Sequence, residues 1–495
     1  MDILVWVIVV LFTYVLIRST FSILGFSKPK NLPPGPTSLP IIGNLHLLGN
    51  QPHRSLAKLA QTHGPIMLLK LGQKTTLVIT STAAAKEVLQ KQDLAFSNRH
   101  IPDALHAHNF SEYSLTVLPI GTQWRFLRRI VHTNIFSDKS LEAKQQIWDQ
   151  KVKELIAFCQ KACMSKDYVD IGGATFTTSM NLISNTLFSK DFINSYEEDS
   201  SKEFRDVVTN ILVDVGKPNL VDFFPVLKKI DPQGIRRRMT RHFGKILAIF
   251  EELIEDRLAM RRSVDDDVLE VCLKISQDSP EELNRSQIKF LMLDMFVGGT
   301  DTTSTTVEWA MTELLRNPDV MAKSKDELKH VIGKGKNIKD HDLSRLPYLL
   351  CIVNETLRLH PPVPLLIPRN VENPVKLCGY IIPKDTQVLV NAWAIGQDPT
   401  IWEDSKEFKP ERFLTRQIDV RGQDFELIPF GAGRRICPGF PLALRTIPII
   451  LGSLVNNFDW NLDVNLQPKV LDMTERFGIS LHKANPLCLI PMPLN

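Results

Sequence analysis

The feature that most constrains the fold of this chain is a short loop near its C-terminus. Residues 430–439 read Phe-Gly-Ala-Gly-Arg-Arg-Ile-Cys-Pro-Gly, so one cysteine, Cys437, stands among glycines and after two arginines. Glycines let a backbone approach a planar ligand closely and turn sharply around a sulfur atom, and arginines supply fixed positive charge for carboxylates. The pattern therefore predicts a thiolate held against a large, flat anion with a metal at its centre, because a metal favours the ionised sulfur.

The loop also fits a known spacing, although a lone cysteine is more often a small buried hydrophobe. Its residues match Phe-x-x-Gly-x-Arg-x-Cys-x-Gly at every fixed position. This resembles the haem-binding loop of the cytochromes P-450, in which a cysteine thiolate is the haem ligand. The resemblance implies that Cys437 ligates iron and that Phe430, Arg435 and Gly439 lie against haem b.

Composition narrows the class of protein further. The 495 residues, 43% of them hydrophobic, can bury a large core, and no linker follows residue 40, so one large domain is expected. The seven cysteines are odd in number and form no Cys-x-x-Cys pair, which argues against disulfides and zinc and for a reducing compartment. The net charge of +4 and the absence of any nucleic-acid motif predict no nucleic-acid partner.

The N-terminus predicts a membrane anchor. Residues 3–17 are almost wholly apolar, residues 21–26 extend that run, and Arg18, Lys28 and Lys30 follow the first part of it. A cleaved signal peptide is the alternative, but Asp2 replaces the usual basic residue and no small-x-small cleavage site is evident. We expect an anchor over residues 1–26, a basic, proline-rich hinge over 27–40, and a cytosolic catalytic domain over 41–495.

The pattern of the remaining chain is mainly helical with a minor β component. Residues 55–62, 83–92 and most of 141–332 show helical spacing, whereas 66–72 and 75–80 alternate like two strands of a hairpin. Short strands are also expected near 375–382 and 386–391. The fold class is therefore mainly α, and the resemblance implies the single-domain cytochrome P-450 fold behind a transmembrane helix.

A helical stretch over residues 286–316 contains the sequence Gly-Gly-Thr-Asp-Thr-Thr, residues 298–303. Glycines, together with threonine hydroxyls that bond back to carbonyls, weaken or bend a helix and open a groove for a small molecule. Asp301 beside Thr302 is an acid next to an alcohol, a pair that we expect to pass protons inward. This resembles the oxygen-activation segment of cytochromes P-450; an ordinary helix with threonines on its solvated side is the alternative.

Three further motifs occur in the order found in cytochromes P-450. Glu355 and Arg358 share a helical face, and Arg412 follows in Pro-Glu-Arg-Phe; by the resemblance the three form a buried network that assembles the haem pocket. Trp124 and Arg128 also share a face, and the resemblance assigns them to a haem propionate. Arg435, Arg99 and Arg369 complete that propionate set.

The resemblance covers nearly the whole chain and points to the plant microsomal branch. Residues 85–99 and 217–234 resemble the geraniol 8-hydroxylases, which hydroxylate monoterpenols. An NADPH- and O₂-dependent monooxygenase of the endoplasmic reticulum membrane is therefore expected, single-pass and with its catalytic domain in the cytosol. The resemblance implies an NADPH-cytochrome P-450 reductase as the electron donor, since the sequence shows no flavin or nicotinamide fingerprint of its own. Alternatives are the same chemistry on a diterpene, a prenylated phenolic or a xenobiotic, or a haem-thiolate isomerase or haem sensor.

The substrate pocket is predicted by analogy only. The implied wall is mainly apolar, so a small hydrophobic substrate is expected, although apolar side chains at these positions also suit a plain core. The predicted wall residues are Leu105, Phe110, Leu115, Phe296, Gly298, Val363, Leu366, Ile367 and Ile479.

Overall fold

The computed structural model describes residues 31–196, 199–259, 267–462 and 471–494, together with Trp6 and Thr13. The predicted anchor over residues 1–26 therefore lies outside the described residues, apart from these two positions. Within the described part, no helix combines the length and the apolar character that a membrane crossing needs.

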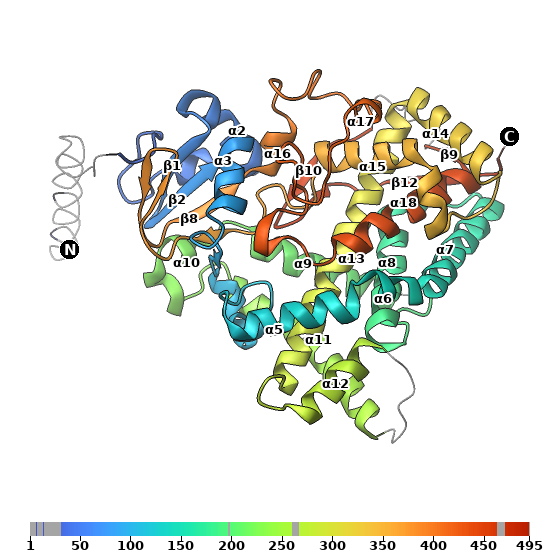
Figure 1. Cartoon of the computed structure of the whole chain (residues 1–495), viewed down its shortest axis with the longest axis horizontal. Coiled ribbons are helices and arrows are strands. Elements are labelled where there is room, and N and C mark those ends of the chain that lie inside the picture. The colour runs from blue at the N-terminus through green and yellow to red at the C-terminus, as the bar shows by residue number, and fades with distance from the viewer. Residues whose placement is uncertain are drawn as a thin grey trace.

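Helices dominate the described chain, as predicted, and they fill the middle and right of Figure 1. The α-helices are α2 (Pro52–His63), α3 (Thr82–Lys86), α4 (Phe110–Tyr113), α5 (Thr122–Ile130), α6 (Asp138–Ala143), α7 (Gln145–Ser165), α8 (Ile171–Phe188), α9 (Asp199–Gly216), α10 (Leu220–Phe223), α11 (Ile235–Ala259), α12 (Val268–Asp278), α13 (Arg285–Arg316), α14 (Pro318–Val331), α15 (Pro347–Leu359), α16 (Ala392–Gly396), α17 (Arg412–Thr415) and α18 (Phe440–Asn457). Shorter helical turns are η1 (Leu45–Leu47), η2 (Glu87–Lys91), η3 (Asp103–Asn109), η4 (Val131–Ile135), η5 (Pro225–Lys229), η6 (Asp340–Arg345) and η7 (Gly433–Arg435).

The β component is small and divided among four sheets. The strands are β1 (Ile66–Leu71), β2 (Lys74–Ile79), β3 (Asn98–Arg99), β4 (Val169–Asp170), β5 (Arg369–Asn370), β6 (Val375–Leu377), β7 (Tyr380–Ile382), β8 (Gln387–Val390), β9 (Asp459–Asn461), β10 (Glu475–Phe477), β11 (Leu481–Lys483) and β12 (Cys488–Met492). The largest sheet has the order β1-β2-β8-β5-β3 and lies at the left of Figure 1. The other sheets are β4-β12-β9, β10-β11 and β6-β7.

The predicted hairpin is confirmed. Strands β1 and β2 pair in antiparallel fashion, in a register that runs from Ile66↔Ile79 to Leu71↔Lys74. Gly72, with φ of +56°, makes the turn, since left-handed backbone favours glycine. β8 then joins β2 in parallel, with Ile79 opposite Val390. That pairing brings the C-terminal third of the chain back onto the N-terminal hairpin.

Helix α13 runs through the centre of the molecule and organises the helical part (Figure 1). A capping box starts it, in which Asn284 and Gln287 each accept from the other's backbone N–H. It packs along α8, α15 and α18. The approach to α8 is close, because a Cβ added at Gly299 would lie 2.8 Å from Ile183 Cδ1. The helix is continuous from Arg285 to Arg316, so the two central glycines do not break it.

Candidate haem site

The Cys437 loop lies between η7 and the start of α18, and its shape depends on two glycines. Gly431 and Gly433 have φ of +72° and +69°, which only glycine adopts without strain. A Cβ added at Gly433 would also lie 1.8 Å from the carbonyl oxygen of Leu89, so the loop touches η2 backbone to backbone. The backbone N–H of Cys437 donates to Phe430 O at 2.9 Å and closes the turn.

The sulfur of Cys437 is buried, so its ionised form needs nearby hydrogen-bond donors or positive charge. Burial raises the pKa of the Cys437 thiol, while the backbone N–H groups of Gly439 and Phe440 and the charge of Arg128 oppose that rise. Gly439 lies beside the sulfur, because a Cβ added there would be in ordinary van der Waals contact with Cys437 Sγ at 3.9 Å. These donors favour the ionised form only in part, and a metal ion bound to sulfur completes the stabilisation.

Four arginines far apart in sequence converge near this loop. Arg99 and Arg369 are direct partners across the antiparallel pair β3–β5. Arg128 donates to Ile436 O at 2.7 Å, and Arg435 stacks over the Trp124 ring at 4.8 Å. Within the described part of the chain, no carboxylate lies within ion-pair distance of any of the four guanidinium groups.

Their donors turn instead to backbone carbonyls. Arg99 donates to Thr116 O and Ile367 O at 3.2 and 2.7 Å. Arg435 donates to Ser97 O, Leu115 O and Leu118 O, and Arg369 donates to Phe96 O at 3.3 Å. This arrangement fixes the side chains in place, but none of the four charges forms an ion pair with a carboxylate of the described residues.

The lack of a compensating anion is visible in the pKa values. Burial, with repulsion from Arg369 and Arg128, lowers the pKa of Arg435 to about 9. Burial lowers that of Arg369 to about 10, and Arg99 is lowered well below its usual value by burial and by the other three arginines. Like charges facing each other across a strand pair are destabilising. A dianionic ligand between these groups removes that cost, so the residues fit the two propionates of haem.

In the Glu355 network, Glu355 and Arg358 are fully buried and the side chain of Arg412 is 10% exposed. Arg358 binds the Glu355 carboxylate with Nε and one terminal nitrogen, at 2.7 and 2.8 Å, and both side chains are inaccessible to solvent. Arg412 Nε adds a third bond at 3.0 Å, and the backbone N–H of Lys409 adds a fourth at 2.8 Å. The structure thus brings the three predicted residues together. Arg358 also donates to three carbonyls of the segment 396–407, so the network fastens that segment to α15.

On α13, the predicted acid and alcohol point in different directions. Thr302 is partly exposed and donates its hydroxyl to Gly298 O at 2.7 Å, as the sequence predicts for threonines here. A Cβ added at Gly298 would meet no other heavy atom within 4 Å, so open space adjoins this face of the helix. Asp301 is 2% exposed and faces the C-terminal strand β11, where His482 lies 3.4 Å from it.

Some predicted pocket residues lie at the Cys437 loop. Leu366, with φ of +49°, has its Cδ1 3.9 Å from a Cβ added at Gly431, so it lies against that loop. Leu366 N donates to Val363 O at 3.1 Å, and Ile367 O accepts from Arg99. The segment 363–367 is therefore held between the loop and the arginine cluster.

Other predicted pocket residues are enclosed by neighbouring side chains. Phe296 is fully buried and packs against Phe192, Phe204 and Phe250, and Phe110 stacks on Phe243. Leu105 and Leu115 are 7% and 5% exposed, and Ile479 N donates to Leu212 O.

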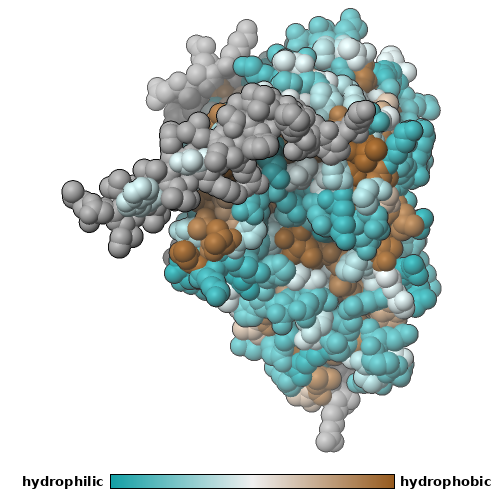
Figure 2. All heavy atoms as spheres, turned by 90° about the vertical axis from the view of Figure 1, so that its left-hand side faces the viewer, coloured by the Kyte–Doolittle hydropathy of each residue, from teal (hydrophilic) through white to brown (hydrophobic). Residues whose placement is uncertain are grey.

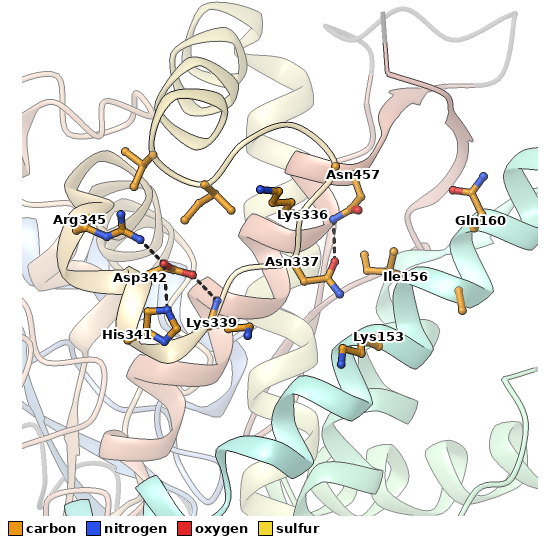
Figure 3. A pocket seen from close by; sticks show the side chains of 14 residues that line it. Lys153, Ile156, Gln160, Lys336, Asn337, Lys339, His341, Asp342, Arg345 and Asn457 are labelled. Atoms are coloured by element: carbon orange, nitrogen blue, oxygen red, sulfur yellow. Dashed lines mark hydrogen bonds and ion pairs between the residues drawn. The ribbon is translucent and has the colours of Figure 1, made fainter.

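A surface hollow of about 670 Å³ lies at a different place (Figure 3). Figure 3 shows Asp342 lying between Arg345 and Lys339, with Lys153 on the neighbouring helix α7. Asn457, the last residue of α18, lines the hollow, whereas the Cys437 loop lies before Phe440, the first residue of the same helix. The 18 residues of that helix span about 27 Å, so the hollow is not part of the haem site.

Comparison with known proteins agrees with this site. The chain belongs to the cytochrome P-450 family, whose profile matches residues 33–489. It is a haem-thiolate monooxygenase that uses O₂ and acts on a small hydrophobic substrate. Its electrons derive from NADPH and reach it through a redox partner. It is 63% identical to a 7-ethoxycoumarin O-deethylase of Helianthus tuberosus over the full length of both chains. It is 59% identical to a geraniol 8-hydroxylase of Catharanthus roseus, again over both full lengths. A geranylhydroquinone 3''-hydroxylase of Arnebia euchroma is 51% identical over 94% of this chain and 95% of its own.

Two residues of the site region were not found by sequence reasoning. Asp294, two turns before Asp301 on α13, accepts from the hydroxyls of Ser114 and Thr116 at 2.7 and 3.1 Å, and burial raises its pKa to about 6. His482 is the other. An isolated acid in an apolar helical stretch was the available signal for Asp294; nothing local marks His482.

Proposed function

We propose that this enzyme hydroxylates a monoterpenol, with geraniol and nerol as the first candidates and C8 as the site of attack. Two geraniol 8-hydroxylases at 59% identity support this substrate, because one of them matches over both full lengths and the other over 94% of each chain. The apolar character of Leu366 and Ile367, where Leu366 lies against the Cys437 loop, suits a small hydrocarbon chain.

Haem bound by Cys437 supplies the activation of dioxygen. The chain's own residues do the rest of the work in this proposal. The arginine cluster neutralises the propionates and orients the haem. Thr302 presents its hydroxyl on the open side of α13, and Asp301 beside it controls proton delivery. The apolar segment 363–367 excludes water and positions the substrate carbon.

A second candidate reaction is O-dealkylation of an aromatic ether, favoured by the 63% identity to a 7-ethoxycoumarin O-deethylase. The two reactions share their first step. Hydroxylation of the ether's CH₂ carbon gives a hemiacetal, which breaks its C–O bond to release the phenol and acetaldehyde. One oxygen atom is inserted into one C–H bond in both cases, so one site serves both substrates, and a prenylated phenolic fits the same scheme.

The deciding experiment compares substrates on one preparation. The full chain, expressed in microsomes with a plant reductase, is given geraniol, nerol, 7-ethoxycoumarin and geranylhydroquinone, and kcat/KM is measured for each. We expect the highest value for a monoterpenol, with 8-hydroxygeraniol or 8-hydroxynerol as the product. A higher kcat/KM for the coumarin or the hydroquinone, with little monoterpenol turnover, contradicts the substrate proposal and leaves the monooxygenase class intact.

We also propose that the chain is anchored in the endoplasmic reticulum membrane, with the catalytic domain in the cytosol. Besides the apolar N-terminal sequence, several apolar side chains of the described residues are exposed: Leu39, Ile41, Ile42, Leu220, Val226 and Ile230. The turn of the β1–β2 hairpin connects the two groups, because Gly72 N donates to Ile42 O and Gln73 N donates to Phe223 O. Figure 2 looks onto this side and shows brown patches among the teal surface. Exposed apolar patches of this kind favour contact with lipid.

Cell fractionation tests the anchor. The full chain is expected in the microsomal pellet and should stay there after extraction with alkaline carbonate. Recovery in the soluble fraction would show that neither the N-terminus nor this face holds the protein on a membrane.

A further inference from the structure

A buried contact joins the central helix α13 to the C-terminal hairpin. His482 Nε2 lies 3.4 Å from Asp301 Oδ2. One turn further along α13, Thr305 Oγ1 lies 3.2 Å from His482 Nδ1. The imidazole ring is 7% exposed as a residue and is bracketed by two side chains of the same helix. Among the described residues, neither Asp301 Oδ2 nor His482 Nε2 has a hydrogen-bond partner, so the two atoms face each other at ion-pair distance, outside hydrogen-bond geometry.

The backbone around His482 holds the ring in this position. His482 pairs with Arg476 in the hairpin β10–β11. On one side of His482, the indole N–H of Trp309 donates to Leu481 O at 3.2 Å, which ties β11 to α13. The turn of the hairpin is pressed against α9, because a Cβ added at Gly216 would lie 1.8 Å from Ile479 N. The imidazole therefore has little freedom to move away from Asp301.

The charges around the ring determine its protonation. Burial lowers the pKa of His482; Asp301 opposes this, and Arg476 on β10 and Arg205 on α9 add to the lowering. His482 is therefore neutral at pH 7 and has a single N–H. A buried carboxylate needs a donor, so this proton belongs on Nε2, toward Asp301, and Nδ1 accepts from the Thr305 hydroxyl.

Two further charged groups lie near the pair. Burial raises the pKa of Glu308, one turn beyond Thr305 on α13, to about 7, and Leu487 N donates to its carboxyl at 2.9 Å. Lys483, next to His482 on β11, stands over the Trp309 ring at 4.8 Å. Neither group lies between Asp301 and His482, so the direct contact carries the inference.

We propose that His482 is a positioning residue for Asp301: its Nε2–H is the donor that the buried carboxylate otherwise lacks, and it keeps that carboxylate in the orientation from which it controls proton delivery beside Thr302. This inference rests on the proposed role of Asp301 and Thr302. Without the imidazole donor, the buried carboxylate turns toward another donor or takes up a proton. Either change misplaces the acid while leaving haem and substrate bound.

The first test reads the contact itself rather than turnover. The full chain, loaded with haem and placed in a lipid nanodisc, is labelled with ¹⁵N-histidine, and the His482 signals are assigned by their loss in His482→Gln. We expect the Nε2–H tautomer at pH 7, and a further lowering of the His482 pKa in Asp301→Asn because the carboxylate charge is gone. A His482 tautomer and pKa that do not respond to Asp301→Asn overturn the proposal.

The second test measures coupling, the product formed per NADPH consumed, with whichever compound of the panel is turned over. His482→Leu should lower coupling roughly tenfold, which is a small part of what a positioned proton donor contributes. The electrons that do not reach product should be recovered as hydrogen peroxide. His482→Gln, whose amide N–H replaces the donor, should restore most of it. Wild-type coupling in His482→Leu overturns the proposal.

A matched control separates this effect from damage to the hairpin. His53 is also fully buried, and its Nε2 lies 3.2 Å from Glu475 Oε2 on strand β10. His53→Gln therefore perturbs the same hairpin without touching α13, and it should keep wild-type coupling. If Asp301→Asn keeps wild-type coupling, the proton-delivery role is wrong and this inference falls with it. A failure of the monoterpenol proposal has a different signature, namely turnover of another compound with the same dependence on His482.

Discussion

Replacing Glu355 by glutamine tests whether the buried carboxylate holds the haem pocket together. Glu355 accepts two bonds from Arg358, one from Arg412 and one from the backbone of Lys409, and it has no exposed surface. Glutamine has nearly the same shape. It keeps one acceptor oxygen but turns an NH₂ group toward a guanidinium that has no other carboxylate.

The expected cost follows from that geometry. Removing one partner of a buried ion pair costs about 3–5 kcal/mol, because the other charge is left unpaired. Here two guanidinium groups lose their partner, although Arg358 keeps three carbonyl acceptors and the cation–π contact with Trp402 at 5.2 Å. We therefore expect the lower part of that range, about 3 kcal/mol. A folded protein is stable by about 5–15 kcal/mol, so much of the margin is lost.

Two measurements on the purified full chain check this. The urea midpoint should fall, and the fraction of protein that gives the thiolate band in the reduced carbon monoxide spectrum should drop with it. The control is Glu203→Gln, which removes an exposed partner of Lys245 and should leave the urea midpoint at its wild-type value, because exposed ion pairs contribute little to stability. If Glu355→Gln keeps both the wild-type midpoint and the full carbon monoxide band, the network does not support the pocket.

The remaining predictions each have an internal control. Arg435→Leu should weaken haem retention on gel filtration, whereas the neighbouring Arg434→Leu, which removes an exposed partner of Asp93, should not. The folded-state pKa of Asp294, about 6, lies above its ordinary value of 3.8, so its contribution to stability is present at low pH and is lost as pH rises through 6. Asp294→Asn should therefore unfold at a higher urea concentration than wild type above pH 6, and not below pH 4. Equal differences at both pH values would refute this. Gly433→Ala should prevent haem binding because its Cβ meets a carbonyl oxygen, while Gly379→Ala, with φ of +89° and open space around it, should cost only about 1 kcal/mol; equal losses would show that backbone strain alone matters.

Local patterns predicted the elements that depend on local spacing. The alternation in residues 66–80 gave the β1–β2 hairpin, and the i, i+3 spacing gave the Glu355–Arg358 pair. The details of these elements that the sequence pattern did not predict also have local causes. The short strands expected near 375–382 are present as β6 and β7, and Cys378 and Gly379, with φ of +47° and +89°, turn the chain between them. The expected helix over 83–92 changes after Lys86 into the wider turn η2.

Contacts between distant segments were not predictable from local pattern. His482 meets Asp301 across 181 positions, and no periodicity connects a strand of three residues to the middle of a helix. The arginine cluster was predicted as a set of side chains facing propionates. Its backbone acceptors, such as Leu115 O and Ser97 O, were not, because a carbonyl carries no residue identity in the sequence.

Those carbonyl acceptors have a consequence for substrate choice. The segment 114–118 is held from one side by Asp294, which bonds Ser114 and Thr116, and from the other by Arg435, which bonds Leu115 O and Leu118 O. The segment is therefore fixed by hydroxyl and carbonyl groups, and its apolar side chains take no part in these bonds. Substitutions at its apolar positions can then reshape a substrate pocket without moving the haem anchors. Substitution of Asp294 would disturb the segment and the haem anchors at once. The apolar positions are therefore the more permissive place for substrate specificity to change.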